Sequence, residues 1–149
     1  MPNIIHRIGT TKATPDQMYN AVTTIEGLSG WWTLNSKGDP GIGGVIQFRF
    51  SKGGPDFQVI DAEPFKRVEW RCIQGPKEWI DTHIEFDISD ENGETVLLFK
   101  HGRWREEVEF MYHCSTQWAY FLISLRKFLE TGKGTPYGSS LEKISEWSK

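Results

Sequence analysis

The apolar residues of this chain recur at every second position between Gly44 and Arg103, and from about Glu107 onward they recur at every third or fourth position. A period of two is typical of a β-strand with one buried face, whereas spacings of three and four are typical of an amphipathic helix. The chain therefore predicts a run of strands followed by one long helix. This order indicates an α+β fold in which the helix covers one face of an antiparallel sheet.

Clusters of turn-forming residues divide the period-two region into segments. The clearest cluster is Asn92-Gly93, because both residues tolerate the positive φ angles of a type I′ hairpin turn. Short connections of this kind imply antiparallel neighbours. With a further β-branched segment at Ile4 to Lys12, the chain predicts a curved sheet of about six strands. The other five strands are expected at about residues 45–51, 57–63, 67–74, 80–89 and 95–102, and the polar segment 35–44 is expected to be a surface loop.

The alternation also predicts which strand residues face the helix. The residues expected to point inward are Phe48, Phe50, Phe57, Val59, Val68, Trp70, Cys72, Thr82, Ile84, Phe86 and Ile88. The last strand is apolar on both faces in its middle, and Leu97, Phe99 and His101 are placed inward because Glu94 and Lys100 then point outward. The wetter side is expected to carry Arg49, Gln58, Glu69, Arg71, His83, Glu85 and Asp87, and Asp61 and Asp81 are likewise assigned to the surface.

Two short helices are expected between the first strand and the loop. Thr14-Pro15-Asp16-Gln17 supplies a capping residue, a proline at the first helical position and a glutamine that can reach back to the cap. A brief helical turn at Leu28 to Trp32 then brings two indole rings to one place. These rings either cap a cavity or close the core beneath the short helices.

The long helix is expected at about residues 107–131, with Gly132 as its left-handed stop. Its apolar stripe consists of Met111, Cys114, Trp118, Phe121, Leu122, Leu125 and Leu129. After Pro136, Ser139-Ser140-Leu141-Glu142 resembles a capping box and predicts an extra C-terminal helix within residues 136–149. The length of 149 residues is expected to form a single domain spanning 1–149.

Composition excludes several classes of partner. The formal charge of −3 and the scattered Lys and Arg residues offer no basic stripe for a nucleic acid. The N-terminus lacks the long apolar run of a signal peptide, and no apolar stretch approaches the roughly 20 residues needed for membrane insertion. The two cysteines, Cys72 and Cys114, form no paired motif and are expected to be free thiols in a reducing compartment, so the expected location is cytoplasmic.

The order of elements resembles the helix-grip fold of the START-like (SRPBCC) superfamily, which includes birch-pollen-type allergens, polyketide cyclases and lipid-transfer domains. Three motifs resemble the branch homologous to the activator of the heat-shock-protein-90 ATPase, and the resemblance covers roughly residues 4–136. The motifs are Gly27-Leu28-Ser29-Gly30-Trp31-Trp32-Thr33, the Gly43-Gly44 entry to Phe48-Arg49-Phe50, and the segment from Trp118 to Pro136. The resemblance implies a cavity-bearing domain that serves as a ligand binder, a lipid carrier or a stress-associated protein.

The residue types that could carry chemistry are few. The four histidines, His6, His83, His101 and His113, lie on separate expected elements without ligand-type spacing, so no metal or other cofactor is expected. Cys114 and His101 could both face the interior as a hydrolase pair, although a buried cysteine is commonly a small apolar packing residue. His101 could act as a general base in a cyclase or aldolase-type reaction, or it could simply be hydrogen-bonded within the wall.

The sequence thus favours binding of a small hydrophobic ligand between the sheet and the last helix, with no catalytic residues assigned. Seven Trp and nine Phe indicate either an aromatic core or an aromatic-lined cavity. The alternatives are an enzyme of the polyketide cyclase or hydrolase type and a co-chaperone module that binds a chaperone. The tail after Pro136 is expected to cover the pocket mouth or to form a homodimer contact. The expected ligand-binding residues are Trp32, Phe48, Phe50, Phe57, Val59, Trp70, Thr82, Ile84, Phe86, Leu97, Phe99, His101, Met111, Cys114, Gln117, Trp118 and Phe121.

Overall fold

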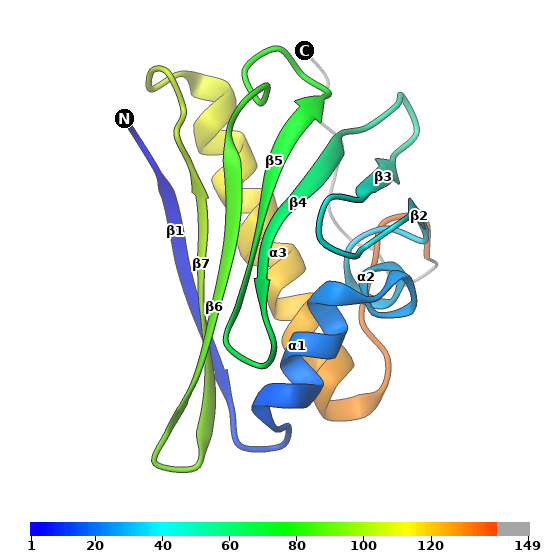
Figure 1. Cartoon of the computed structure of the whole chain (residues 1–149), viewed down its shortest axis with the longest axis vertical. Coiled ribbons are helices and arrows are strands. Elements are labelled where there is room, and N and C mark those ends of the chain that lie inside the picture. The colour runs from blue at the N-terminus through cyan, green and yellow to red at the C-terminus, as the bar shows by residue number, and fades with distance from the viewer. Residues whose placement is uncertain (140–149) are drawn as a thin grey trace.

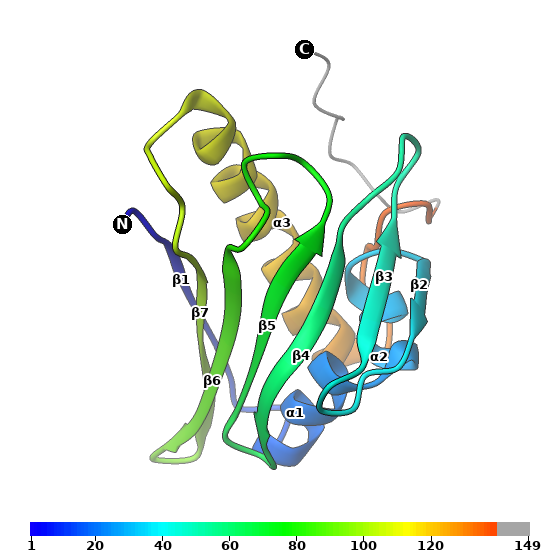
Figure 2. The ribbon, with the colours of Figure 1, turned by 45° about the horizontal axis from the view of Figure 1, so that its top comes forward.

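A curved antiparallel sheet wraps one long helix in the computed structural model, which describes residues 1–139 (Figure 1). The long helix α3 crosses one face of the sheet, and the short helices α1 and α2 lie beside it (Figure 2). The elements are, in chain order, β1 (Ile4–Thr10), α1 (Pro15–Thr23), α2 (Ile25–Trp31), β2 (Asn35–Gly38), β3 (Val45–Arg49), β4 (Asp56–Glu63), β5 (Arg67–Gln74), β6 (His83–Glu91), β7 (Glu94–Gly102) and α3 (Glu109–Thr131).

Within residues 1–139 the sheet has seven strands in the order β1-β7-β6-β5-β4-β3-β2, and every neighbouring pair is antiparallel. This arrangement confirms the predicted α+β helix-grip architecture. Asn92 and Gly93 have φ angles of 57° and 88°, as the predicted hairpin between β6 and β7 requires.

The prediction of about six strands was one strand short, because the segment expected to be a loop contains β2. Residues Asn35 to Gly38 pair with Arg49 to Ile46 of β3. These four residues are polar or glycine and show no apolar alternation. Their strand geometry is therefore imposed by hydrogen bonding to β3, which a pattern of side chains does not reveal.

The predicted helix signals act where the sequence places them. The Thr14 side chain accepts a hydrogen bond from the Gln17 amide, and the Gln17 side chain accepts one from the Thr14 backbone, which completes a capping box around Pro15. At the other end of the chain, Gly132 stops α3 with a φ of 84° and donates to the Phe128 carbonyl. The helix α3 begins at Glu109, two residues later than predicted.

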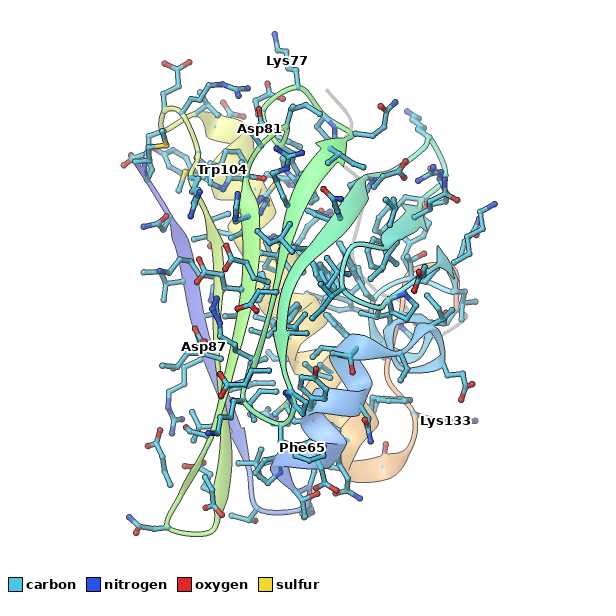
Figure 3. The ribbon with its side chains drawn as sticks, viewed as in Figure 1. Phe65, Lys77, Asp81, Asp87, Trp104 and Lys133 are labelled. Carbon is cyan, nitrogen blue, oxygen red and sulfur yellow. The ribbon has the colours of Figure 1, made fainter. Side chains whose placement is uncertain are left out.

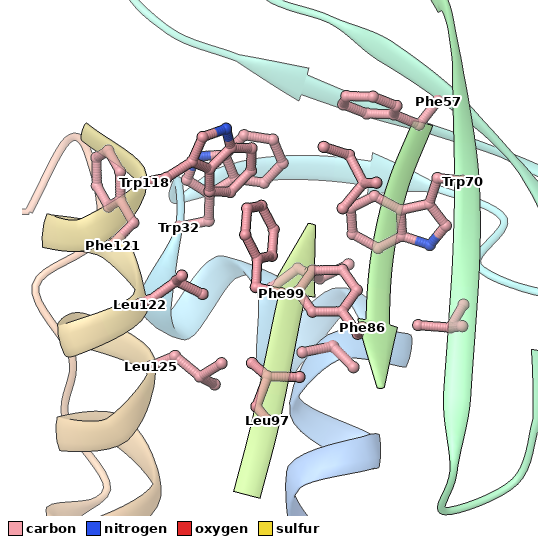
Figure 4. Close-up of a cluster of buried hydrophobic side chains, with 14 of the residues drawn as sticks. Trp32, Phe57, Trp70, Phe86, Leu97, Phe99, Trp118, Phe121, Leu122 and Leu125 are labelled. Carbon is pink, nitrogen blue, oxygen red and sulfur yellow. The ribbon is translucent and has the colours of Figure 1, made fainter. Parts of the chain in front are cut away.

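The core lies between the sheet and the apolar stripe of α3. Trp118, Leu122 and Leu125 project from the helix toward rings on the strands (Figure 4). The inward assignment of the last strand is confirmed, because Leu97, Phe99 and His101 are at most 1% exposed.

The outer face of the sheet carries charged side chains around Arg67. Its guanidinium lies 3.0 Å from Glu69 and 3.2 Å from Glu85, with Asp87 at 3.5 Å and Asp61 at 4.0 Å. Asp61, Asp81 and Asp87 are exposed as predicted, and Figure 3 labels the last two.

One residue on this outer face departs from expectation. His83 was placed on the wetter side, yet it is only 6% exposed. Its Nδ1 lies 2.6 Å from Oε2 of Glu69 on the neighbouring strand, and the two side chains shield each other from water.

The predicted C-terminal helix and the predicted lack of a membrane span remain to be compared with the structure. The predicted C-terminal helix falls largely on residues 140–149, which lie outside the described residues. Within residues 1–139, no helix is both long enough and apolar enough to cross a membrane.

Candidate ligand-binding cavity

Aromatic rings fill the middle of the space between the sheet and α3. The ring of Trp70 lies 5.6 Å from that of Phe48 and 5.1 Å from that of Phe86, and Phe86 lies 5.5 Å from Phe99. All four side chains are at most 1% exposed. Rings at these separations are in direct contact, so this part of the grip is a packed core.

An open cavity of about 670 Å³ lies at one end of the grip, between the first half of α3, the turn that joins β3 to β4, and the connection from β5 to β6. Its volume falls within the roughly 300–1,000 Å³ typical of small-molecule sites. It is lined by Trp32, Arg49, Phe50, Ser51, Lys52, Gly53, Gly54, Pro55, Gln74, Gly75, Pro76, Trp79, Phe110, His113, Cys114, Gln117, Trp118, Phe121 and Tyr137.

The cavity brings together only part of the predicted ligand-binding set. Six of the predicted residues line the cavity, namely Trp32, Phe50, Cys114, Gln117, Trp118 and Phe121. The remaining predicted residues are buried away from this lining, in the packed core and its margins, and they are Phe48, Phe57, Val59, Trp70, Thr82, Ile84, Phe86, Leu97, Phe99, His101 and Met111.

The turn between β3 and β4 forms one wall. Phe50 and Gly53 bond to each other through their backbones, at 2.7 Å and 3.3 Å, and so close the turn. Gly53 has a φ of 105°, and a Cβ at Gly54 would come within 2.0 Å of the Phe48 carbonyl oxygen. Both positions therefore need glycine, one for backbone conformation and one for space.

Tyr137 holds this turn against the rest of the molecule. Its hydroxyl accepts a hydrogen bond of 3.2 Å from the Ser51 amide, and its ring meets Phe50 edge-on at 5.0 Å. The Tyr137 amide donates to the Trp32 carbonyl at 2.7 Å. The end of α2, the turn and the segment after α3 are thus joined at the cavity.

The connection from β5 to β6 supplies a second wall through Trp79. The Trp79 amide donates to the Pro76 carbonyl at 2.9 Å, and the Thr82 amide donates to the Trp79 carbonyl at the same distance. These turns bring the indole inward, where it is 8% exposed and lies nearly parallel to Trp118 at 6.3 Å. A strand was predicted to begin at residue 80, but β6 begins at His83 because the preceding residues form these turns.

The two adjacent tryptophans of the helical turn have different roles. Trp31 is fully buried and donates its indole N–H to the Ala21 carbonyl, so it closes the core beneath α1 and α2. Trp32 lines the cavity, where its ring lies 4.8 Å from that of Trp118. Each alternative considered for the pair therefore applies to one of its members.

His101 lies behind the cavity in a closed hydrogen-bond network. Its Nδ1 accepts from the Trp118 indole at 3.1 Å, and its Nε2 lies 2.8 Å from Oγ1 of Thr82. Since an indole N–H can only donate, Nδ1 carries no proton and the neutral ring donates through Nε2. Thr82 in turn donates to the Trp79 carbonyl at 2.6 Å.

Complete burial of His101 lowers its pKa to about 3, so the ring is neutral at physiological pH. Both ring nitrogens are already used within the protein, and the residue does not line the cavity. This geometry fits the role of a wall residue that holds Trp118 and Trp79, and it offers no lone pair to a substrate.

Cys114 lines the cavity, but its environment disfavours a thiolate. Burial raises the pKa of this thiol to about 12. Burial also lowers the pKa of the neighbouring His113. The cavity therefore presents a protonated thiol rather than the activated nucleophile that a cysteine hydrolase needs.

The structure offers no candidate metal centre within the part of the chain that it describes. No three His, Cys, Asp or Glu side chains among residues 1–139 form a group that could hold a metal ion.

Sequence reasoning missed several lining residues, chiefly Trp79, Phe110, His113 and Tyr137. Phe110 could have been found, because it lies four positions before Cys114 and so continues the inward face of α3. The sequence indicates Trp79 more weakly: a large aromatic ring that follows a Gly-Pro turn is expected to be buried, but the turn does not show where. Tyr137 follows the helix and has no periodic signal.

Comparisons with known proteins were consistent with this architecture. The family model described as activator of Hsp90 ATPase homolog 1-like protein matches residues 12–130. No functionally curated protein sequence matches the chain.

Several solved structures share the fold. The solution structure of the Aha1 dimer from Colwellia psychrerythraea is 46% identical, with a TM-score of 0.82, and the match covers 90% of this chain and 100% of that one. CalU16 from Micromonospora echinospora is 22% identical, with a TM-score of 0.72 over 85% of this chain and 73% of that one. Protein SSP2350 from Staphylococcus saprophyticus is 17% identical, with a TM-score of 0.72 over 89% and 95%.

Proposed function

The chain belongs to the activator of Hsp90 ATPase homolog 1-like family, and from this premise we propose that it binds a small hydrophobic molecule in the cavity beside α3. The observation that carries the proposal is the cavity of about 670 Å³, whose walls include Trp32, Trp79 and Trp118. Water that fills an open cavity of this size lies against apolar ring surface. An apolar guest that displaces this water removes the ring surface from it, which is favourable.

Mass spectrometry of the purified native protein tests the proposal directly. A copurifying small molecule, released on denaturation, is the expected result. In parallel, the ligand-free protein is titrated with flavonoids, fatty acids and polyketides, and binding should change tryptophan emission because three indoles line the cavity. A protein that carries no molecule, and whose emission and melting temperature do not respond to any of these compounds, would contradict the proposal.

The arrangement of polar groups favours binding over catalysis by the residues that sequence reasoning had singled out. His101 has both nitrogens engaged, and Cys114 is held as a neutral thiol. A cyclase or hydrolase mechanism through this pair would need a free base beside a cavity-facing nucleophile.

A second candidate function is a protein interaction in which the chain pairs with itself and with a chaperone. It is favoured by the 46% identity to a structure described as an Aha1 dimer. Light scattering after size exclusion should then give twice the mass of 17.2 kDa. A pull-down with purified heat-shock-protein-90 chaperone, repeated after deletion of residues 137–149, tests the chaperone contact. A monomer that retains no chaperone would rule out this candidate.

A further inference from the structure

Indole rings of Trp32, Trp79 and Trp118 line the cavity. The rings of Trp79 and Trp118 are nearly parallel, with an interplanar angle of 16°, and Trp32 is tilted by 36° from Trp118. Flat ring faces favour flat ring guests, because stacking adds to the gain from burying apolar area.

The charge around the cavity is one-sided. None of the described residues that line it is an aspartate or a glutamate, although the chain has 20 acidic residues against 17 basic ones. Two cationic side chains line it together, Arg49 at the end of β3 and Lys52 on the turn that follows. The guest therefore meets positive charge at this wall and no negative charge from the lining.

The two cations differ in how they are neutralised. Arg49 is paired with Asp56 at 2.7 Å, and the side-chain hydrogen bonds that it makes to described residues all use Nη1. Lys52 is exposed and forms no salt bridge with any residue that the structure describes. The pair of Arg49 and Asp56 is neutral overall, so Lys52 leaves a net positive charge at the rim.

Resting on the ligand-binding function proposed above, we infer that the ligand is a planar aromatic molecule with an anionic substituent, whose ring packs on the indoles while its anion faces Lys52. A carboxylate, a sulfonate or an ionised phenol would supply the charge. Arg49 lies on the same wall, and its guanidinium edge opposite Nη1 can donate to the same anion.

Two fluorescent probes with the same aromatic frame separate the ring from the charge. 1-Anilinonaphthalene-8-sulfonate carries a sulfonate, and N-phenyl-1-naphthylamine is its uncharged counterpart. Both probes emit more strongly in apolar surroundings, so each can be titrated into the purified full-length protein.

The decisive variant is Lys52→Gln. It should weaken binding of the sulfonate probe by about fivefold, the scale of one exposed ion pair, and leave the neutral probe within about twofold. Lys52→Glu should weaken the sulfonate probe further. Lys37→Gln is the matched control, since it removes the same charge from an exposed residue of β2 that does not line the cavity. Added salt should weaken only the sulfonate probe, because screening acts on exposed charges.

The outcomes separate this inference from the proposed function. If both probes bind but Lys52→Gln affects them equally, or affects neither, the anionic ligand is rejected and the hydrophobic site stands. If Lys37→Gln has the same effect as Lys52→Gln, the effect reflects overall charge and the inference also fails. If neither probe binds the wild-type protein, the ligand-binding function itself is contradicted.

Discussion

The indole N–H of Trp118 donates a hydrogen bond of 3.1 Å to Nδ1 of His101, and this bond ties the wall of the cavity to the interior of the sheet. Trp118 comes from α3 and His101 from β7, so the bond joins the two layers of the fold. A buried histidine and a cavity-lining ring are thereby held as one unit. Stability and ligand binding should respond together when this unit is disturbed.

The histidine makes stability depend on pH. In the unfolded chain His101 should titrate near its ordinary pKa of 6.5, whereas burial lowers the pKa to about 3 in the folded protein. Between these values the unfolded chain binds a proton that the folded chain does not, so the free energy of unfolding falls as the pH falls. The loss contributed by His101 should be about 2 kcal/mol between pH 7 and pH 5.

Urea denaturation of the wild type and of His101→Gln at both pH values measures this contribution. Glutamine can keep a hydrogen bond but cannot take up the proton, so the variant should lose much less stability on acidification. Equal losses in the two proteins would show that His101 is not the titrating group.

Filling the cavity should abolish ligand binding without unfolding the protein. Gln117→Trp adds a large ring at a lining position, and it should weaken a bound apolar probe by about tenfold or more, equivalent to at least about 1.4 kcal/mol. Thr116→Trp adds the same ring one position earlier, on the exposed side of α3, and should leave affinity unchanged. Calorimetric titration compares the two, and similar affinities would place the ligand elsewhere.

Both cysteines should resist alkylation in the folded protein. Burial raises the pKa of Cys72 and of Cys114 to about 12, from a reference of 9.0. At pH 8 this lowers the thiolate fraction by about a thousandfold, and only the thiolate reacts. Iodoacetamide labelling followed by mass spectrometry should therefore be slower in buffer than in denaturant by two orders of magnitude or more, roughly. Rapid labelling of Cys114 in the native protein would revive the nucleophile hypothesis.

The charged side chains on the outer face of the sheet should depend on Arg67 for their contribution to stability. Arg67 lies among four carboxylates and is 23% exposed, so Arg67→Gln should lower the free energy of unfolding by about 1–3 kcal/mol, because like charges are left together. Arg71→Gln is the control, since the one ion pair of Arg71 within residues 1–139 is with Asp81, at 3.7 Å and with both side chains well exposed. The Arg71→Gln variant should lose no more than about 0.5 kcal/mol of its free energy of unfolding. Equal falls in melting temperature for the two variants would show that the cluster of four carboxylates around Arg67 does not make this position more important for stability.

Much of the fold could be read from local patterns. The alternation of Phe48, Trp70 and Phe86 placed their side chains inward, and the structure buries all three completely. The capping box at Thr14 and the stop at Gly132 acted as predicted. These features depend on residues close together in the chain, and the backbone geometry of one strand or helix is enough to express them.

The candidate site was predicted less completely. The sequence predicts Phe48, Phe57 and Trp70 in the wall of one hollow, whereas the structure packs these three rings against one another and leaves the cavity beyond them. Trp79 entered the wall from a turn, where no periodicity marks which way a ring points.

The sequence by itself determined the kind of each element except β2, the buried faces of the strands β3 to β7 and the inward stripe of α3, because hydrophobic period and capping chemistry are properties of neighbouring residues. Tertiary structure alone decided the pairing of β2 with β3, the neutral state of His101 and the place of the cavity beside Lys52. Whether a space between two layers is filled depends on how side chains from distant segments interlock, and whether a group keeps its charge depends on the water that this packing excludes.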